Sequence, residues 1–220
     1  MSSSTENQRP HLLLMTALVI SLSITAGSIF FIFYRLTLAQ ATNTGTAIVN
    51  SSSAFTGATI VDPPQKLNNF TLAGNDGNPL SLSDLAGHVT LIYFGYTNCP
   101  DFCPTTLSDF KRVKTLMAAN ASDVNFLMIS VDGTRDNPVR MHDYLGEFDP
   151  DFLGMTGAKQ EVKRIGVDFG LDFDEQTGEP YTVDHTASVF MVDQEGKLRA
   201  VFTYGTEPII IAEGIKGLLS

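Results

Sequence analysis

The two cysteines of the chain, Cys99 and Cys103, lie four residues apart in the stretch Thr97-Asn98-Cys99-Pro100-Asp101-Phe102-Cys103-Pro104. They follow the apolar run Val89 to Tyr96, which predicts a buried strand, and Pro104 is typical of the first turn of a helix. Two thiols at the corner between a strand and a helix can bind a soft metal ion or exchange with a disulfide. A structural disulfide is a weaker explanation, because closing so short a loop adds little stability.

His185, in the sequence Val183-Asp184-His185-Thr186, is the candidate for a third ligand. It precedes the apolar segment 188–192, which can run as a strand beside the cysteine strand, so that two thiols and one imidazole would meet. Soft thiolates favour copper(I) and imidazole also accepts copper(II), whereas zinc usually takes a fourth ligand. The alternative is a histidine hydrogen-bonded at a strand entrance, with Asp184 as a turn residue or as the partner that orients the ring.

The other three histidines are weaker candidates because of their positions. His11 precedes an apolar N-terminal segment, and His142 falls inside a predicted helix. His88 comes just before the cysteine strand, which places it at the end opposite the thiols. We therefore expect His88 to be structural, whereas His11 and His142 still compete with His185 on these grounds.

The hydrophobic pattern predicts the elements that position these residues. Apolar side chains recur at helical spacing after Pro104, and Cys103 falls near the start of this helix, where the dipole should stabilise a thiolate. The further predicted elements are a capped turn at 81–85, strands at 89–94 and 126–131, helices at 138–145 and 158–167, a hairpin with strands at 188–192 and 198–203, and a helix at 208–219. Strand, helix, parallel strand, hairpin and helix is the order of a thioredoxin-like α/β fold.

A second polar motif, Ser130-Val131-Asp132-Gly133-Thr134-Arg135-Asp136, ends the second core strand. This is the edge of the sheet where α/β folds usually bind their ligands. Asp132, Arg135 and Asp136 have a simpler explanation, since an Asp before a helix is a common cap and an Arg between two acids is a common ion pair. We therefore predict a structural role for these three residues.

The first third of the chain does not have the pattern of a globular domain. We expect a short tail at 1–11, a transmembrane helix at 12–34, a flexible linker at 35–61 and the folded domain at 62–220. Leu12 to Tyr34 carries no charge and is long enough to cross about 30 Å of hydrocarbon. A cleaved signal peptide ending near Ala39-Gln40-Ala41 is the alternative, although its apolar part should span only about 7–15 residues. One basic residue on each side leaves the orientation undecided.

The charge of the chain bears on its partners. It has 14 Lys and Arg against 24 Asp and Glu, a net charge of −10. This balance argues against nucleic acid and anionic lipid headgroups as partners and favours a basic one. Ordinary solubility explains the same acidity, so charge alone names no function.

Three motifs in this order, Tyr93 to Pro104, Ser130 to Asp136 and Tyr181 to Thr186, resemble the Sco/SenC family. The resemblance covers about Leu67 to Leu219. Proteins of this family are membrane-tethered, have a thioredoxin fold and deliver copper to the dinuclear copper (CuA) site of cytochrome c oxidase. The resemblance implies that Cys99, Cys103 and His185 bind a copper ion.

The resemblance also implies partners and a location. The copper-bearing subunit of cytochrome c oxidase would be the acceptor, and a periplasmic copper donor or a thioredoxin-like reductase would act on the same cysteines. Residues 1–10 lack the Arg-rich, acid-poor pattern of a mitochondrial presequence. We therefore expect a single-pass protein of the bacterial inner membrane with its domain in the periplasm, rather than one of the mitochondrial inner membrane.

Two other functions remain open on the sequence. The same dithiol can reduce the acceptor's disulfide through a mixed disulfide, with Cys99 and Cys103 redox-active and no metal required. A redox or copper sensor that signals to a membrane partner would need the same features. We expect a metallochaperone and not an enzyme, with thiol-disulfide reductase activity as the alternative.

Overall fold

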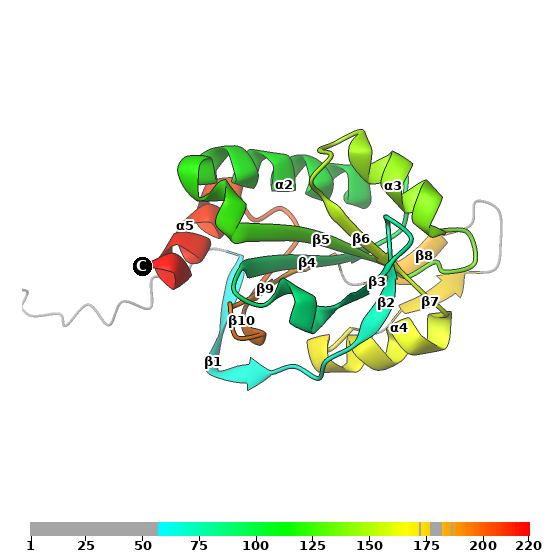
Figure 1. Cartoon of the computed structure of the whole chain (residues 1–220), viewed down its shortest axis with the longest axis horizontal. Helices are drawn as coiled ribbons and strands as arrows, with labels where there is room; N and C mark the ends of the chain where they lie inside the picture. The colour runs from blue at the N-terminus through cyan, green and yellow to red at the C-terminus, as the bar shows by residue number, and fades with distance from the viewer. Residues whose placement is uncertain (1–56, 172, 177–181, 186) are drawn as a thin grey trace, which may run out of the picture. The chain divides into compact units, whose positions relative to one another are not determined.

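The computed structural model describes residues 57–171, 173–176, 182–185 and 187–220, and the side chains of 174–176 and 182–185 are not described (Figure 1). The predicted tail, transmembrane helix and most of the linker lie outside these ranges. Within them, no helix is both long and apolar enough to span a bilayer. The first strand begins at Ala58, so residues 58–61, predicted as linker, belong to the folded domain. The reason is that β1 pairs antiparallel with β10 from its first residue, with Ala58 opposite Phe202.

The described strands and helices follow the predicted order, with several short strands added. The strands are β1 (Ala58–Lys66), β2 (Thr71–Gly74), β3 (Pro79–Ser81), β4 (Val89–Gly95), β5 (Val124–Ser130), β6 (Leu153–Thr156), β7 (Phe173–Gln176), β8 (Thr182–His185), β9 (Val189–Val192) and β10 (Lys197–Phe202). The α-helices are α2 (Phe102–Met117), α3 (Pro138–Gly146), α4 (Lys159–Gly166) and α5 (Pro208–Leu219). The 3₁₀ helices are η1 (Leu82–Leu85), η2 (Ala118–Asp123) and η3 (Val167–Phe169).

Eight of these strands form one mixed sheet, in the order β1-β10-β9-β4-β5-β6-β2-β3. β4 and β5 run parallel at its centre, from Val89 opposite Val124 to Gly95 opposite Ser130. On the other side of β4 lies β9, which is antiparallel and places Val189 opposite Tyr93. β7 and β8 form a separate two-stranded sheet.

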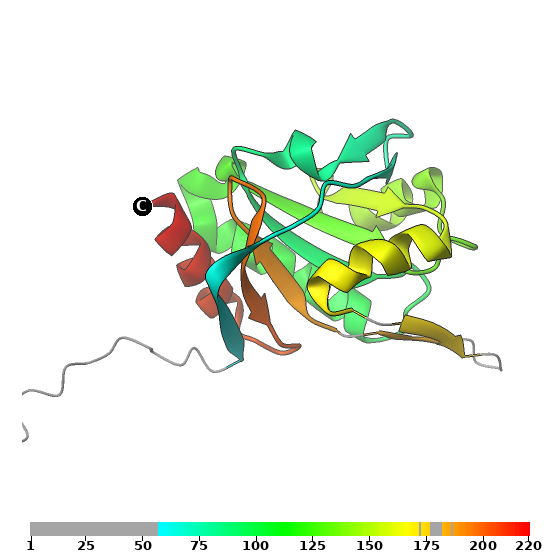
Figure 2. The ribbon, with the colours of Figure 1, turned by 90° about the horizontal axis from the view of Figure 1, so that it is seen from below.

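Helices cover both faces of the central strands. α2 and α3 lie on one face and α4 on the other, and the view from below shows α4 in front of the sheet (Figures 1 and 2). All seven residues of β4 are buried, as expected for a strand covered on both faces. The sheet is therefore a rigid support for the loop that follows β4, which carries both cysteines.

Candidate dithiol and metal site

The loop between β4 and α2 presents the two thiols at the carboxyl edge of the sheet. Cys99 lies in a turn in which its N–H donates to the carbonyl of Tyr96 at 3.3 Å. The predicted helix start at Pro104 is two residues late: α2 begins at Phe102, and Cys103 is its second residue. Pro104 fits inside the first turn because backbone N–H groups there have no partner within the helix.

The two cysteine sulfurs are held close together. The backbone N–H of Cys103 donates to Cys99 Sγ at 3.5 Å, and Tyr93 Oη donates to Cys103 Sγ at 3.3 Å. Cys103 is fully buried, whereas Cys99 keeps 9% of its surface exposed. Both are free thiols. The pair is thus a buried, reduced dithiol in which Cys99 is the more exposed of the two residues.

Cys103 is not the thiolate that its place at a helix start predicts. Its pKa is raised above the ordinary value, first by the hydrogen bond with Cys99 and then by burial. The metal-free protein thus differs from that prediction, because the hydrogen bond with Cys99 and the burial of the sulfur both favour the neutral thiol of Cys103. A bound cation would reverse the balance, since thiols that bind metal lose their protons.

Two tyrosines surround the thiols. Burial, followed by the charge of Cys103, raises the pKa of Tyr93, so its hydroxyl stays a hydrogen-bond donor. Burial, followed by the charges of both cysteines, also raises the pKa of Tyr144. The hydroxyl of Tyr144 is buried and has no hydrogen-bond partner among the described residues. The fully buried Tyr93, which contacts Cys103 Sγ, therefore helps to keep that sulfur away from bulk water.

Gly95, at the end of β4, makes room for the buried sulfur. A Cβ there would lie 2.6 Å from Tyr93 Cε1 and 3.1 Å from Cys103 Sγ. Cβ atoms in proteins essentially never come within 3.0 Å of another heavy atom, so any larger residue at position 95 would displace Tyr93 or the Cys103 sulfur. This packing was not predicted from the sequence, because nothing in the apolar run marks Gly95 as facing Cys103.

The backbone leads His185 toward the same edge of the sheet. β9 enters the sheet where β4 ends, and His185 lies four residues before Val189. It is the last residue of β8 and pairs with Phe173 of β7. Among the side chains that the structure describes, no group of three His, Cys, Asp or Glu gathers to hold a metal ion. The side chain of His185 is outside that set, so the ligand set Cys99, Cys103 and His185 stays a prediction.

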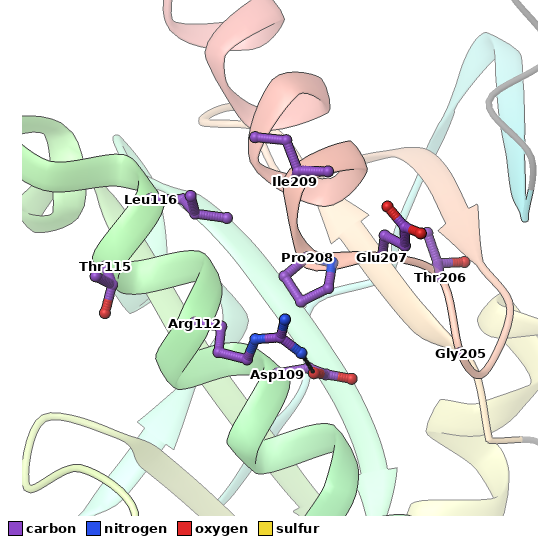
Figure 3. A pocket seen from close by; sticks show the side chains of 9 residues that line it. All are labelled: Asp109, Arg112, Thr115, Leu116, Gly205, Thr206, Glu207, Pro208 and Ile209. Carbon is purple, nitrogen blue, oxygen red and sulfur yellow. Dashed lines mark hydrogen bonds and ion pairs between the residues drawn. The ribbon is translucent and has the colours of Figure 1, made fainter.

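A pocket of about 790 Å³ between α2 and the start of α5 is separate from the thiols (Figure 3). Asp109 and Arg112 of α2 form an ion pair at 3.2 Å on one side, and Glu207, Pro208 and Ile209 lie on the other. Neither cysteine lines it. This pocket therefore does not contribute to the dithiol site.

Comparison with known proteins decides the family. The profile of the SCO1/SenC family matches residues 59–220. The chain belongs to the SCO1/SenC family. A SCO2-like protein of Rickettsia felis is 32% identical over 152 residues, which cover 67% of this chain and 74% of that protein. The predicted resemblance is thus confirmed.

Solved structures confirm the thioredoxin-like α/β fold. ScoI of Bradyrhizobium japonicum, solved with copper bound, is 34% identical, covers 70% of this chain and 99% of its own, and has a TM-score of 0.63. BsSco, a member of the Sco family of cytochrome c oxidase assembly proteins with a disulfide switch, covers 73% and 97% with a TM-score of 0.62. At 24% identity, BsSco is similar in fold alone. Copper and cytochrome c oxidase assembly are thus properties of this chain's relatives.

Proposed function

We propose that this protein is a copper metallochaperone that binds one copper ion through Cys99, Cys103 and His185 and delivers it to the CuA site of cytochrome c oxidase. The observation that carries the proposal is the contact between the Cys103 N–H and Cys99 Sγ. This contact holds the two cysteines, both soft ligands, side by side at the carboxyl edge of β4. β9 enters the sheet at this same edge, and His185 lies shortly before β9 in the chain. Two thiolates and one imidazole suit copper in either oxidation state.

Support for copper comes from the family and from the donor set. ScoI of Bradyrhizobium japonicum holds copper on the same fold. Cys99 is the more exposed of the two cysteine residues, so an acceptor thiolate would reach the ion from its side. Transfer would then proceed by ligand exchange, with acceptor thiolates replacing those of this chain one at a time.

The location follows from the sequence and belongs to the same proposal. Residues 12–34 would anchor the chain in the inner membrane, and the domain would lie in the periplasm. The copper-bearing oxidase subunit would be the acceptor there. A copper donor would load the site, and a thioredoxin-like reductase would keep the cysteines reduced.

Thiol-disulfide exchange is the second candidate, favoured by two free cysteines of which one, Cys99, accepts a hydrogen bond at its sulfur from the backbone N–H of the other. Cys99 would attack, since Cys103 is fully buried. The raised pKa of Cys103 makes this sulfur a poor nucleophile and a poor leaving group at neutral pH. That property counts against fast exchange, whereas for copper it makes the affinity depend on pH, because a bound metal ion has to displace the proton.

Copper retention by His185→Ala separates the two functions. The full chain in detergent is loaded with copper(I) and titrated with a copper(I) chelator, with His142→Ala in α3 as the matched control. We expect one copper per chain in the wild type and in the control. We expect His185→Ala to lose affinity by about 100-fold or more, because even residues that only support a ligand change metal affinity by about 10–100-fold.

Exchange with a small disulfide, measured on the same proteins, completes the test. His185→Ala should keep most of this activity, because the imidazole takes no part in it. A wild type that cannot hold copper against a weak chelator, or an alanine variant that holds it equally well, would refute the three-ligand site. Thiol exchange would then be the better account.

A further inference from the structure

The loop that carries Cys99 is fastened by a buried carboxylate from outside the dithiol site. Asp136, between β5 and α3, accepts the Thr97 N–H at 3.0 Å and the Thr97 hydroxyl at 2.6 Å. It also accepts the Ser130 hydroxyl at 2.7 Å, from the end of β5. Asp136 is 2% exposed. A carboxylate this deep, with three donors directed at it, fixes the backbone two residues before Cys99.

Asp136 is not the helix cap that the sequence predicts. Asn137 caps α3, and its side chain accepts the Arg140 N–H at 3.0 Å. The carboxylate of Asp136 is turned instead toward the cysteine loop. The expectation of a routine cap is therefore wrong, because the neighbouring asparagine already occupies the cap position.

Arg140 adds a second attachment to the same loop. Its Nε donates to Thr97 Oγ1 at 2.6 Å, and its Nη2 donates to Asn98 Oδ1 at 2.8 Å. The Nε also lies 3.7 Å from Asp136 Oδ1, so that the carboxylate and the guanidinium hold Thr97 from two sides. The two residues before Cys99 are thus tied to the start of α3 by side chains of opposite charge.

We propose that Asp136 is a positioning residue of the dithiol site, which fixes Thr97 so that Cys99 Sγ stays within reach of the Cys103 N–H. The inference rests on the proposed function for its copper readout, although the loop contacts stand without it. Asparagine cannot replace Asp136, because a carboxylate only accepts hydrogen bonds and an amide brings two donors. An amide nitrogen in place of Oδ2 would face the Thr97 N–H, and in place of Oδ1 it could no longer accept the Thr97 hydroxyl and would lie near the Arg140 guanidinium.

Asp132 supplies a matched control for Asp136→Asn. It is also fully buried and also ion-paired, with Arg135 Nε at 2.6 Å, but its carboxylate does not contact Thr97 or Asn98. Asp132→Asn therefore reproduces the loss of a buried charge in the same motif without releasing the loop. Arg140→Gln, at a position 48% exposed, gives a variant that folds even if Asp136→Asn does not.

The test compares these variants in the full chain in detergent, by copper(I) competition and by the sulfur-to-copper(II) absorption band. We expect Asp136→Asn to weaken copper retention by about tenfold or more and to shift the band, with a smaller change in Arg140→Gln. Asp132→Asn should lower the melting temperature and leave both copper readouts as in the wild type. If Asp136→Asn and Asp132→Asn give the same copper readouts, Asp136 is only structural and the proposal fails.

Two measurements on the metal-free chain keep this inference separate from the proposed function. Asp136→Asn should speed hydrogen exchange at the Thr97 amide and alkylation of Cys99, and Asp132→Asn should change neither. A wild type that holds no copper would refute the proposed function, yet these two rates would still decide whether Asp136 positions the loop. Unchanged rates in both variants would overturn the positioning role.

Discussion

At the scale of single residues, the unusual feature of the site is a buried thiol that keeps its proton. Cys103 Sγ accepts a hydrogen bond from the Tyr93 hydroxyl, and the backbone N–H of Cys103 donates to Cys99 Sγ. The residue has no solvent exposure. Its raised pKa follows from these contacts. The metal-free site therefore holds Cys103 as a neutral thiol, and binding a cation there must release its proton.

Copper affinity should consequently depend on pH well above neutrality. The thiolate binds copper, and the pKa of Cys103 lies above the ordinary value for a thiol of about 8.5. Each proton displaced should strengthen apparent binding by about tenfold per pH unit as the pH rises. Chelator competition at several values between pH 6 and 9 would show this slope. An affinity that is constant above pH 7 would mean that Cys103 is already ionised.

The residue scale is also where the sequence was least informative beyond the cysteines. Spacing alone identified Cys99 and Cys103, because they are the two thiols of the chain and flank a helix start. The raised pKa and the contact between Asp136 and Thr97 depend on which side chains the fold buries together. Pairs that lie 39 residues apart in the chain leave no local pattern to read.

At the scale of elements, the join between β4 and α2 builds the site. The strand supplies Tyr93 and Gly95, and the helix supplies Cys103 in its first turn. Long periodic segments such as these were predicted within two residues at their ends. β2, β3 and β6 were missed because each has only three or four residues and lacks the continuous apolar run that marked the equally short β9.

Gly95→Ala should damage this join. A methyl group there would contact Tyr93 and Cys103 Sγ, and overpacking of this kind costs about 1–3 kcal/mol. Gly217→Ala is the matched control, because a Cβ at that position in α5 meets no atom within 4 Å. It should raise stability by up to about 1 kcal/mol, since alanine favours helix. The melting temperatures of the two metal-free variants measure these effects. A Gly95→Ala variant as stable as the wild type would contradict this account.

At the scale of the whole molecule, charge is the property most relevant to a partner. The net charge of −10 should draw a basic acceptor toward the domain, since long-range attraction raises association rates. Composition could predict this property but not which face meets the partner, which depends on the fold.

Copper transfer should therefore slow as salt is added. With the soluble copper-bearing domain of the oxidase subunit as acceptor, we expect the second-order rate to fall by about tenfold or more between 0.05 and 0.5 M salt. Stopped-flow absorption at the acceptor's copper bands measures it, and copper retention without acceptor controls for loss of the ion. A rate independent of salt would rule out steering by charge.

The measurement that tests the central claim most directly is copper K-edge X-ray absorption of the copper(I)-loaded chain. The Cys99, Cys103 and His185 site predicts two sulfur neighbours and one nitrogen neighbour at copper, with the nitrogen lost in His185→Ala. A first shell with a single sulfur in the wild type, or a shell unchanged by His185→Ala, would contradict it.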